Sequence, residues 1–212
     1  MSTCSEQGLP PLAIVGISLK FPGDAVTPED FWKMLLEGRA AASEFPPDRV
    51  NIDALYHPDR ERLDRLSTRG ANFMKGDLGA FDAGFFTINT TEAEAMDPQQ
   101  RLILEASYRA LENAGITMAE ASGSKTCVFT GSFSHDYNML QVKDPMTLPK
   151  WHATGTSMNM LSNRVSWFFN LQGPSATVDT ACSSSLMAIY LACQSIWSGN
   201  SSMVRTVKMS LA

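Results

Sequence analysis

Cysteine is scarce in this sequence, with four residues in 212, and no two of them form a CxxC pair. This spacing argues against zinc ribbons and thioredoxin-type redox sites, and isolated thiols fit a reducing compartment. The sequence also lacks any block of lysine and arginine, and its formal net charge is −5 with a pI near 5.2. These values argue against a nucleic-acid partner.

Long hydrophobic runs are absent as well. The apolar run at residues 12–19 is too short to span a bilayer. No basic segment precedes this run, so it also makes a poor secretory signal. We therefore expect a cytoplasmic protein that does not insert into a membrane.

The composition indicates a folded chain, because 44% of the residues are hydrophobic and 18% are charged. Three short apolar runs have the pattern of strands buried on both faces of a sheet: residues 12–18, 127–130 and 175–178. Helix signals alternate with them. Thr27 and Asp97 are expected to cap helices, the second with a capping-box-like start, and Gly38 and Gly115 to end them. This alternation predicts an α/β layer architecture with a largely parallel sheet.

The most informative stretch is residues 179–186, which read DTACSSSL. Small residues here join a strand-like run to a helix-like run, a pattern that predicts a tight turn with Cys182 at its apex and a helix opening there. A thiol at a helix N-terminus meets unpaired N–H groups and the positive end of the helix dipole, and both favour the thiolate. A lone cysteine is more often a small buried hydrophobe, but the flanking sequence favours a reactive thiol.

DTACSSSL resembles the active-site signature of β-ketoacyl synthases, in the form found in type I polyketide synthases and animal-type fatty acid synthases. Three other segments resemble further parts of these enzymes: residues 12–23 (LAIVGISLKFPG), 96–105 (MDPQQRLILE) and 131–137 (GSFSHDY). The resemblance implies the first half of the thiolase-like layered α/β fold, a duplicated unit. It divides the chain into a disordered lead-in (1–11), a β-ketoacyl synthase N-terminal domain (12–199) and a divergent tail (200–212). Arg205 and Lys208 suit a central buried strand poorly, which predicts a truncated or alternatively spliced product.

The resemblance also implies a chemistry. Cys182 would accept an acyl group from the phosphopantetheine thiol of an acyl carrier protein or domain, with its own backbone N–H as an oxyanion donor. Condensation with a malonyl unit then follows, with loss of carbon dioxide. Phosphopantetheine stays on the carrier, so no cofactor or metal is expected on this chain, and the family forms homodimers. Its two catalytic histidines and a lysine come from the second half. The HATGT run at residues 152–156 echoes the family's HGTGT motif but precedes Cys182, so we expect this chain alone not to condense.

Three other hypotheses remain open. The chain could be an inactive fragment that acts only by interaction with a full-length synthase. It could be an unrelated cysteine hydrolase, although no papain-like or caspase-like signature surrounds Cys182. It could be a thioesterase of the α/β-hydrolase type, but Thr180 and Ser184 occupy the glycine positions of that family's nucleophile turn.

Overall fold

The computed structural model describes residues 9–208, and side chains as far as residue 204. Two compact units are present. Residues 9–17 and 79–208 form the first, here called the sheet unit, and residues 18–78 form the second, the hairpin unit. Most of the predicted lead-in (1–11) and the end of the predicted tail (209–212) lie outside the described residues.

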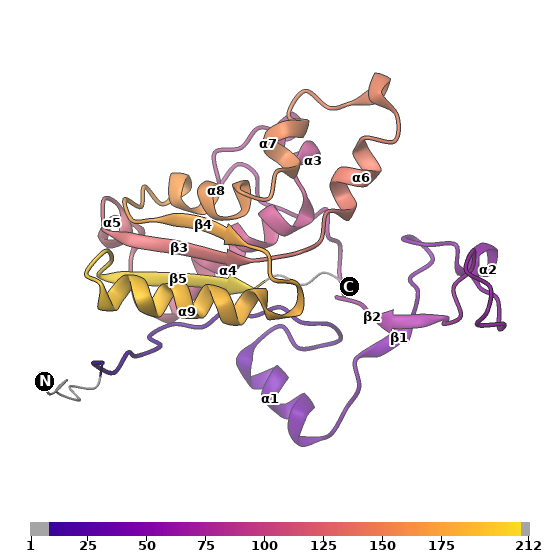
Figure 1. Cartoon of the computed structure of the whole chain (residues 1–212), viewed down its shortest axis with the longest axis horizontal. Helices are drawn as coiled ribbons and strands as arrows, with labels where there is room; N and C mark the ends of the chain where they lie inside the picture. Colours follow the sequence, from indigo (N-terminus) through magenta and orange to yellow (C-terminus); the bar gives the residue numbers. More distant parts are fainter. Residues whose placement is uncertain (1–8, 209–212) are drawn as a thin grey trace, which may run out of the picture. The chain divides into compact units, whose positions relative to one another are not determined.

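A three-stranded parallel sheet organises the sheet unit (Figure 1). Its central strand is β3 (Thr126–Gly131), which pairs with β4 (Ser175–Val178) on one side and β5 (Met203–Lys208) on the other. All six residues of β3 are buried. The strands predicted over residues 127–130 and 175–178 are therefore confirmed, as is the parallel α/β arrangement.

Helices cover both faces of this sheet (Figure 1). On one face, Ala188 and Ala192 of α9 (Ser184–Trp197) pack against Cys127 and Phe129. Val128, whose side chain points the other way because successive strand residues alternate, joins the larger core. That core is built mainly from α4 (Pro98–Asn113), α8 (Met160–Phe168) and the segments beside them, with these buried members: Phe86, Ile88, Met96, Ile103, Leu104, Leu111, Ala121, Leu161, Val165, Phe169 and Leu171.

Short helical segments connect these elements. They are α3 (Thr90–Ala95), α5 (Met118–Ala121), α6 (Asp136–Gln141), the 3-10 turn η1 (Pro145–Thr147), α7 (His152–Thr156) and the 3-10 turn η2 (Ala181–Ser183). No helix in the described part of the chain is long and apolar enough to cross a membrane.

The hairpin unit contains α1 (Pro28–Leu36), α2 (Ile52–Leu55) and an antiparallel pair, β1 (Ala42–Glu44) with β2 (Gly70–Asn72). Thr27 caps α1 as predicted, because its hydroxyl oxygen accepts a hydrogen bond from the Asp30 N–H at 3.1 Å. Gly38, with φ of +61°, follows the end of the helix.

The prediction of a strand at residues 12–18 is wrong, because residues 9–20 have no regular secondary structure. The Ile17 N–H donates to the Asn113 side chain at 2.9 Å instead of to a neighbouring strand. Ile14 and Val15 are 87% and 62% exposed. The apolar run therefore finds no strand partner and no cover among the described residues.

Within the predicted tail (200–212), the backbone forms β5 over Met203–Lys208, in register with β3. In the described sheet β5 is an edge strand and not a central one.

Gly131, the last residue of β3, determines how closely α9 approaches the sheet. A Cβ atom at this position would lie 2.6 Å from the Ser184 carbonyl carbon and 2.7 Å from the Ser185 nitrogen. Both are backbone atoms, so no side-chain rotation relieves the contact. The first turn of α9 can reach the strand only because residue 131 has no side chain.

We predict that Gly131→Ala lowers the free energy of unfolding by about 1–3 kcal/mol, because an added methyl group must displace helix backbone. Urea denaturation followed by circular dichroism measures the change. Gly84→Ala is the matched control, since a Cβ there makes only an ordinary contact, 3.6 Å from Asp82 Oδ1. The control should stay within about 0.5 kcal/mol of the parent. Equal stability of the two variants would contradict the packing argument.

Candidate active site

Cys182 lies in η2, between the end of β4 and the start of α9. Its thiol is free and exposed. The predicted arrangement of strand, turn and helix is confirmed, with the helix proper beginning two residues later at Ser184. The thiol thus lies at the carboxyl end of a parallel strand, the edge of an open α/β sheet where ligands bind.

The turn is held by side chains from within it. Asp179 Oδ1 accepts from the Ala181 N–H at 3.0 Å. Ser184 Oγ accepts from the Thr180 N–H at 2.9 Å and donates to the Ala181 carbonyl at 2.7 Å. Ser183 Oγ donates to the Thr180 carbonyl at 2.7 Å. The small polar residues around Cys182 therefore fix its backbone and leave its thiol at the surface.

Ala181, directly before the cysteine, has φ of +53°. For a residue with a Cβ, this left-handed conformation costs about 1–2 kcal/mol. Such a conformation persists only where the surrounding structure determines it, and it is found often at functional sites. The sequence alone gave no indication of it, since alanine carries no preference for positive φ.

The loop that follows β3 lies beside the turn. Its first residue, Ser132, is 1% exposed and donates its N–H to the Val178 carbonyl at 3.2 Å, one residue before Asp179. The Ser132 hydroxyl donates to Gln99 Oε1 at 2.6 Å. The N-terminus of α4 therefore contacts the strand end that carries the cysteine turn.

Asp97 caps α4, because its Oδ1 accepts from the Gln99 N–H at 2.8 Å. The predicted capping box is not closed, since the Gln100 side chain donates to the carbonyls of Thr154 and Gly155 at 3.0 and 2.8 Å. Burial raises the pKa of Asp97 above its ordinary value, partly offset by the hydrogen bonds from Gln99. This buried polar cluster was absent from the sequence-based site, which held only Cys182. The sequence feature that could have pointed to this cluster is the MDPQQ run, in which two glutamines follow the cap of a helix.

The HATGT run has a structural role here. Gly155 packs on the backbone before α4, where a Cβ would meet the Ala95 carbonyl oxygen at 2.3 Å. Its own carbonyl accepts from the Asp97 N–H at 2.8 Å. His152 Nδ1 lies 2.8 Å from Gln141 Oε1. These contacts explain the sequence of the run without catalysis.

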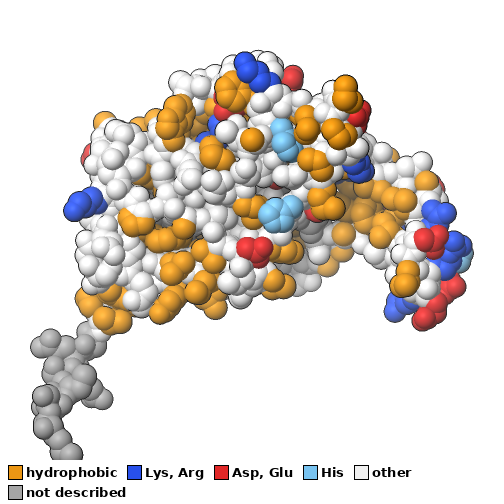
Figure 2. All heavy atoms as spheres, turned by 45° about the horizontal axis from the view of Figure 1, so that its top comes forward, with side chains coloured by type: hydrophobic (Ala, Val, Ile, Leu, Met, Phe, Trp, Pro, Cys, Tyr) orange, Lys and Arg blue, Asp and Glu red, His pale blue; other side chains and the backbone are white. Residues whose placement is uncertain are grey.

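The other two histidines are placed differently. His135 precedes α6 and is exposed, and His57 lies in the hairpin unit, where its Nδ1 accepts from the Asp59 N–H at 3.1 Å. Figure 2 shows histidine side chains at the surface, beside hydrophobic ones. Among the described hydrogen bonds, none joins a histidine to Cys182. A cysteine hydrolase needs such a base, so the geometry gives that hypothesis no support.

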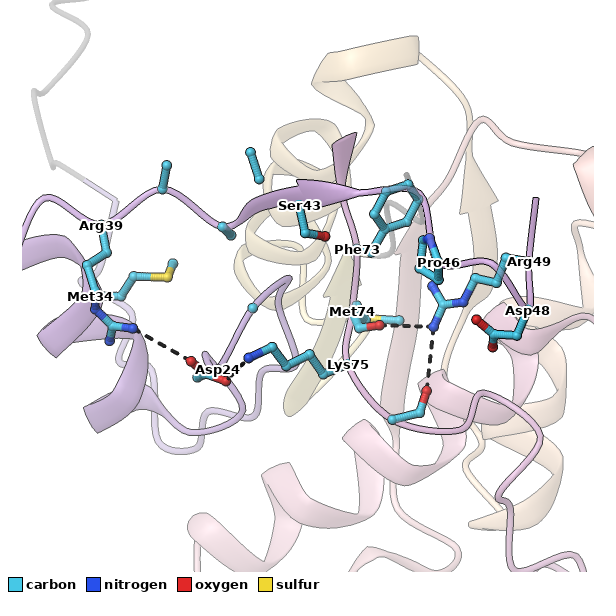
Figure 3. Close-up of a pocket in the computed structure, with 15 residues that line it drawn as sticks. Asp24, Met34, Arg39, Ser43, Pro46, Asp48, Arg49, Phe73, Met74 and Lys75 are labelled. Atoms are coloured by element: carbon cyan, nitrogen blue, oxygen red, sulfur yellow. Dashed lines mark hydrogen bonds and ion pairs between the residues drawn. The ribbon is translucent and has the colours of Figure 1, made fainter. Parts of the chain in front are cut away.

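A cavity of about 400 Å³ lies in the hairpin unit (Figure 3). Asp24 accepts from Lys75 Nζ at 2.6 Å and lies 3.7 Å from an Arg39 nitrogen. The hydrogen bond and charge of Lys75 lower the pKa of Asp24. Arg49 donates to the Met74 carbonyl at 3.0 Å. All of the lining residues belong to the hairpin unit, and Cys182 is not among them.

Comparisons with known proteins show the family of the chain. The family model "Beta-ketoacyl synthase, N-terminal domain" matches residues 10–206. The highly reducing polyketide synthase ausV of Aspergillus calidoustus is 49% identical over 194 residues, which cover 92% of this chain and 8% of that protein. The reducing polyketide synthase FUB1 of Gibberella moniliformis is 50% identical over 190 residues, 90% of this chain and 8% of that protein. The chain thus spans a small part of these relatives.

Two solved structures are similar. The oxazolomycin ketosynthase domain OzmH KS7 of Streptomyces albus JA3453 matches with a TM-score of 0.87 and 34% identity, over 94% of this chain and 34% of that chain. The ketosynthase from module 6 of the bacillaene synthase of Bacillus subtilis 168 matches with a TM-score of 0.79 and 32% identity, over 94% and 32%. Since the family model also covers most of the sequence, the chain belongs to the N-terminal domain family of the β-ketoacyl synthases and has their thiolase-like α/β fold.

Proposed function

We propose that this chain is the N-terminal part of a ketosynthase domain from a reducing polyketide synthase, and that Cys182 accepts the acyl group. The observation that carries the proposal is the exposed thiol of Cys182 in the turn before α9, in a chain of this family. Reducing polyketide synthases among the relatives support the synthase class. We also place the protein in the cytoplasm.

The first step is a thioester exchange. The Cys182 thiolate attacks the carbonyl carbon of an acyl group on the carrier's phosphopantetheine sulfur. The carbonyl oxygen becomes an oxyanion, to which the Cys182 N–H can donate. The intermediate then expels the carrier thiolate, which takes up a proton, and the acyl group remains on Cys182. A thiolate is suited both to accepting the acyl group and to releasing it later, since it is a strong nucleophile and a good leaving group.

The second step, decarboxylative condensation, requires hydrogen-bond donors beyond the cysteine turn. Loss of carbon dioxide from a malonyl carrier leaves an enolate, whose oxygen needs hydrogen-bond donors before its carbon can attack the acyl-cysteine. The family resemblance assigns these donors to histidines in motifs that residues 1–212 do not contain. The carrier itself supplies phosphopantetheine, and so it is a partner in both steps.

We predict that Cys182 reacts with iodoacetamide faster than Cys127 or Cys193 by at least tenfold. Cys182 is exposed, whereas Cys127 is fully buried and Cys193 is only partly exposed. Burial restricts the access of the reagent to a thiol, so the exposed cysteine reacts first. Timed alkylation of the folded chain followed by peptide mass spectrometry measures the three rates. Equal rates for Cys182 and Cys193 would contradict the proposal.

We predict that the 212-residue chain takes an acyl group from an acyl carrier but releases no carbon dioxide from a malonyl carrier. Removal of a single oxyanion donor costs about a hundredfold to a thousandfold in rate, so loss of both histidines should abolish condensation. Intact-mass measurement detects the acyl group, and radiolabelled malonyl carrier detects decarboxylation. Cys182→Ala is the control. Carbon dioxide release and extended product above that control would show that this chain condenses.

We further propose that two copies of the chain associate through β4, as the family resemblance implies. Within the described sheet β4 is an edge strand. The Pro174 carbonyl accepts from the Val128 N–H of β3, and the Val178 carbonyl accepts from the N–H of Ser132, directly after β3. Because the direction of backbone groups alternates along a strand, the N–H groups of Ser175 and Thr177 face the free edge. A second β4 can pair with them.

Ser175→Pro tests this pairing. The substitution removes an N–H on the free edge and leaves the bonds to β3 intact. We predict a weaker dimer for Ser175→Pro in analytical ultracentrifugation, by about tenfold in dissociation constant. Ser175→Ala is the matched control, because it loses the same hydroxyl, which bonds Asn163 at 2.8 Å, but keeps the N–H. A monomeric parent chain, or equal dimerisation of both variants, would rule out association through this edge.

A further inference from the structure

We infer that Gln99 is a positioning residue for the Cys182 turn and that it acts through the loop after β3. The inference rests in part on the proposed function, because acyl transfer to Cys182 is one of its measurements. Gln99 lies in the first turn of α4 and is 3% exposed.

The chemistry of its neighbours fixes the orientation of the Gln99 amide. Its Nε2 lies 3.3 Å from Asp97 Oδ2 and 3.3 Å from the Ser134 carbonyl, and both of these oxygens can accept. The amide oxygen must therefore face Ser132, whose hydroxyl donates to it at 2.6 Å. Gln99 thus holds the loop at two points, on either side of Phe133.

The loop transmits this position to the cysteine turn. Ser132 continues directly from Gly131, which packs on the backbone of Ser184 at the start of α9. The Ser132 N–H also bonds to Val178 at the end of β4. Val178, which precedes the turn, therefore contacts Ser132 itself, and Ser184, which follows the turn, contacts Gly131, the residue before Ser132. A shift of Ser132 moves the base of a turn that already contains a positive φ.

Gln100 provides an internal comparison. It is adjacent to Gln99, belongs to the same helix and is 1% exposed. Its hydrogen bonds go to Thr154 and Gly155 in α7 and to the Nε of Arg164 in α8. These contacts stabilise the fold, and none of the described ones reaches the loop after β3. The two glutamines therefore separate a positioning role from a purely structural one.

The experiment compares Gln99→Met with Gln100→Met in the 212-residue chain. Each substitution keeps a long unbranched side chain and leaves buried polar partners without a hydrogen bond. Two rates are measured by mass spectrometry: acylation of Cys182 by hexanoyl-N-acetylcysteamine, and alkylation of Cys182 relative to Cys193 by iodoacetamide. Thermal unfolding is recorded for every variant. Both substitutions should lower the unfolding temperature. Only Gln99→Met should slow both reactions of Cys182, by about fivefold or more.

Ser132→Ala gives an independent test, because it removes the same bond from the other side. Ser132→Ala should also lower the acylation and alkylation rates of Cys182. The double variant with Gln99→Met should react no more slowly than the slower of the two single variants. Equal effects of the two glutamine substitutions, or full reactivity of Ser132→Ala, would overturn the inference. If the parent chain takes no acyl group, the proposed function fails. In that case, the alkylation rate of Cys182 relative to Cys193 is the measurement that tests the positioning role.

Discussion

The contact between the end of β3 and the first turn of α9 is the constraint on which the cysteine turn depends. Gly131 pairs with Val178, the last residue of β4, and it also touches the backbone of Ser184. Residues 179–183, the five residues between Val178 and Ser184, therefore form a turn that begins and ends beside Gly131. Within these five residues Ala181 takes a conformation with positive φ. The position of Cys182 thus follows from one close backbone contact.

A buried polar cluster joins the helices that pack on the other face of the sheet. Arg164, 6% exposed, pairs with Glu92 at 2.6 Å and donates to Gln100 at 2.9 Å. Isolated buried charges are costly, but a pair whose remaining donors are hydrogen-bonded is tolerated. Gln100 also bonds to Thr154 and Gly155 of α7. Because the cluster thus joins four helices, it favours a single arrangement of α3, α4, α7 and α8. The MDPQQ run thereby contributes specificity of packing in addition to a helix start.

The sequence predicted the parts of the fold that local signals determine. Small residues between a strand pattern and a helix pattern were sufficient to locate the Cys182 turn, and Thr27 and Asp97 were sufficient to locate two helix starts. The sequence-based prediction failed where the structure of a segment depends on residues distant in the chain. An apolar run such as residues 12–18 indicates that burial is favourable, but it does not say whether a strand partner exists. Likewise, the burial of Gln99 depends on distant partners, the Ser134 carbonyl as an acceptor and the Ser132 hydroxyl as a donor.

The division of chemistry between local and distant groups follows from the same structure. Acyl transfer needs a thiolate and a nearby N–H, and the contacts that hold both come from the sheet unit: Gly131, Ser132, Val178 and Ser184. Decarboxylation creates charge on a second substrate, so its donors must reach beyond the turn. A cysteine turn can therefore be complete as a nucleophile and still require other residues for condensation. This is why acylation and carbon dioxide release are separate measurements of the proposed function.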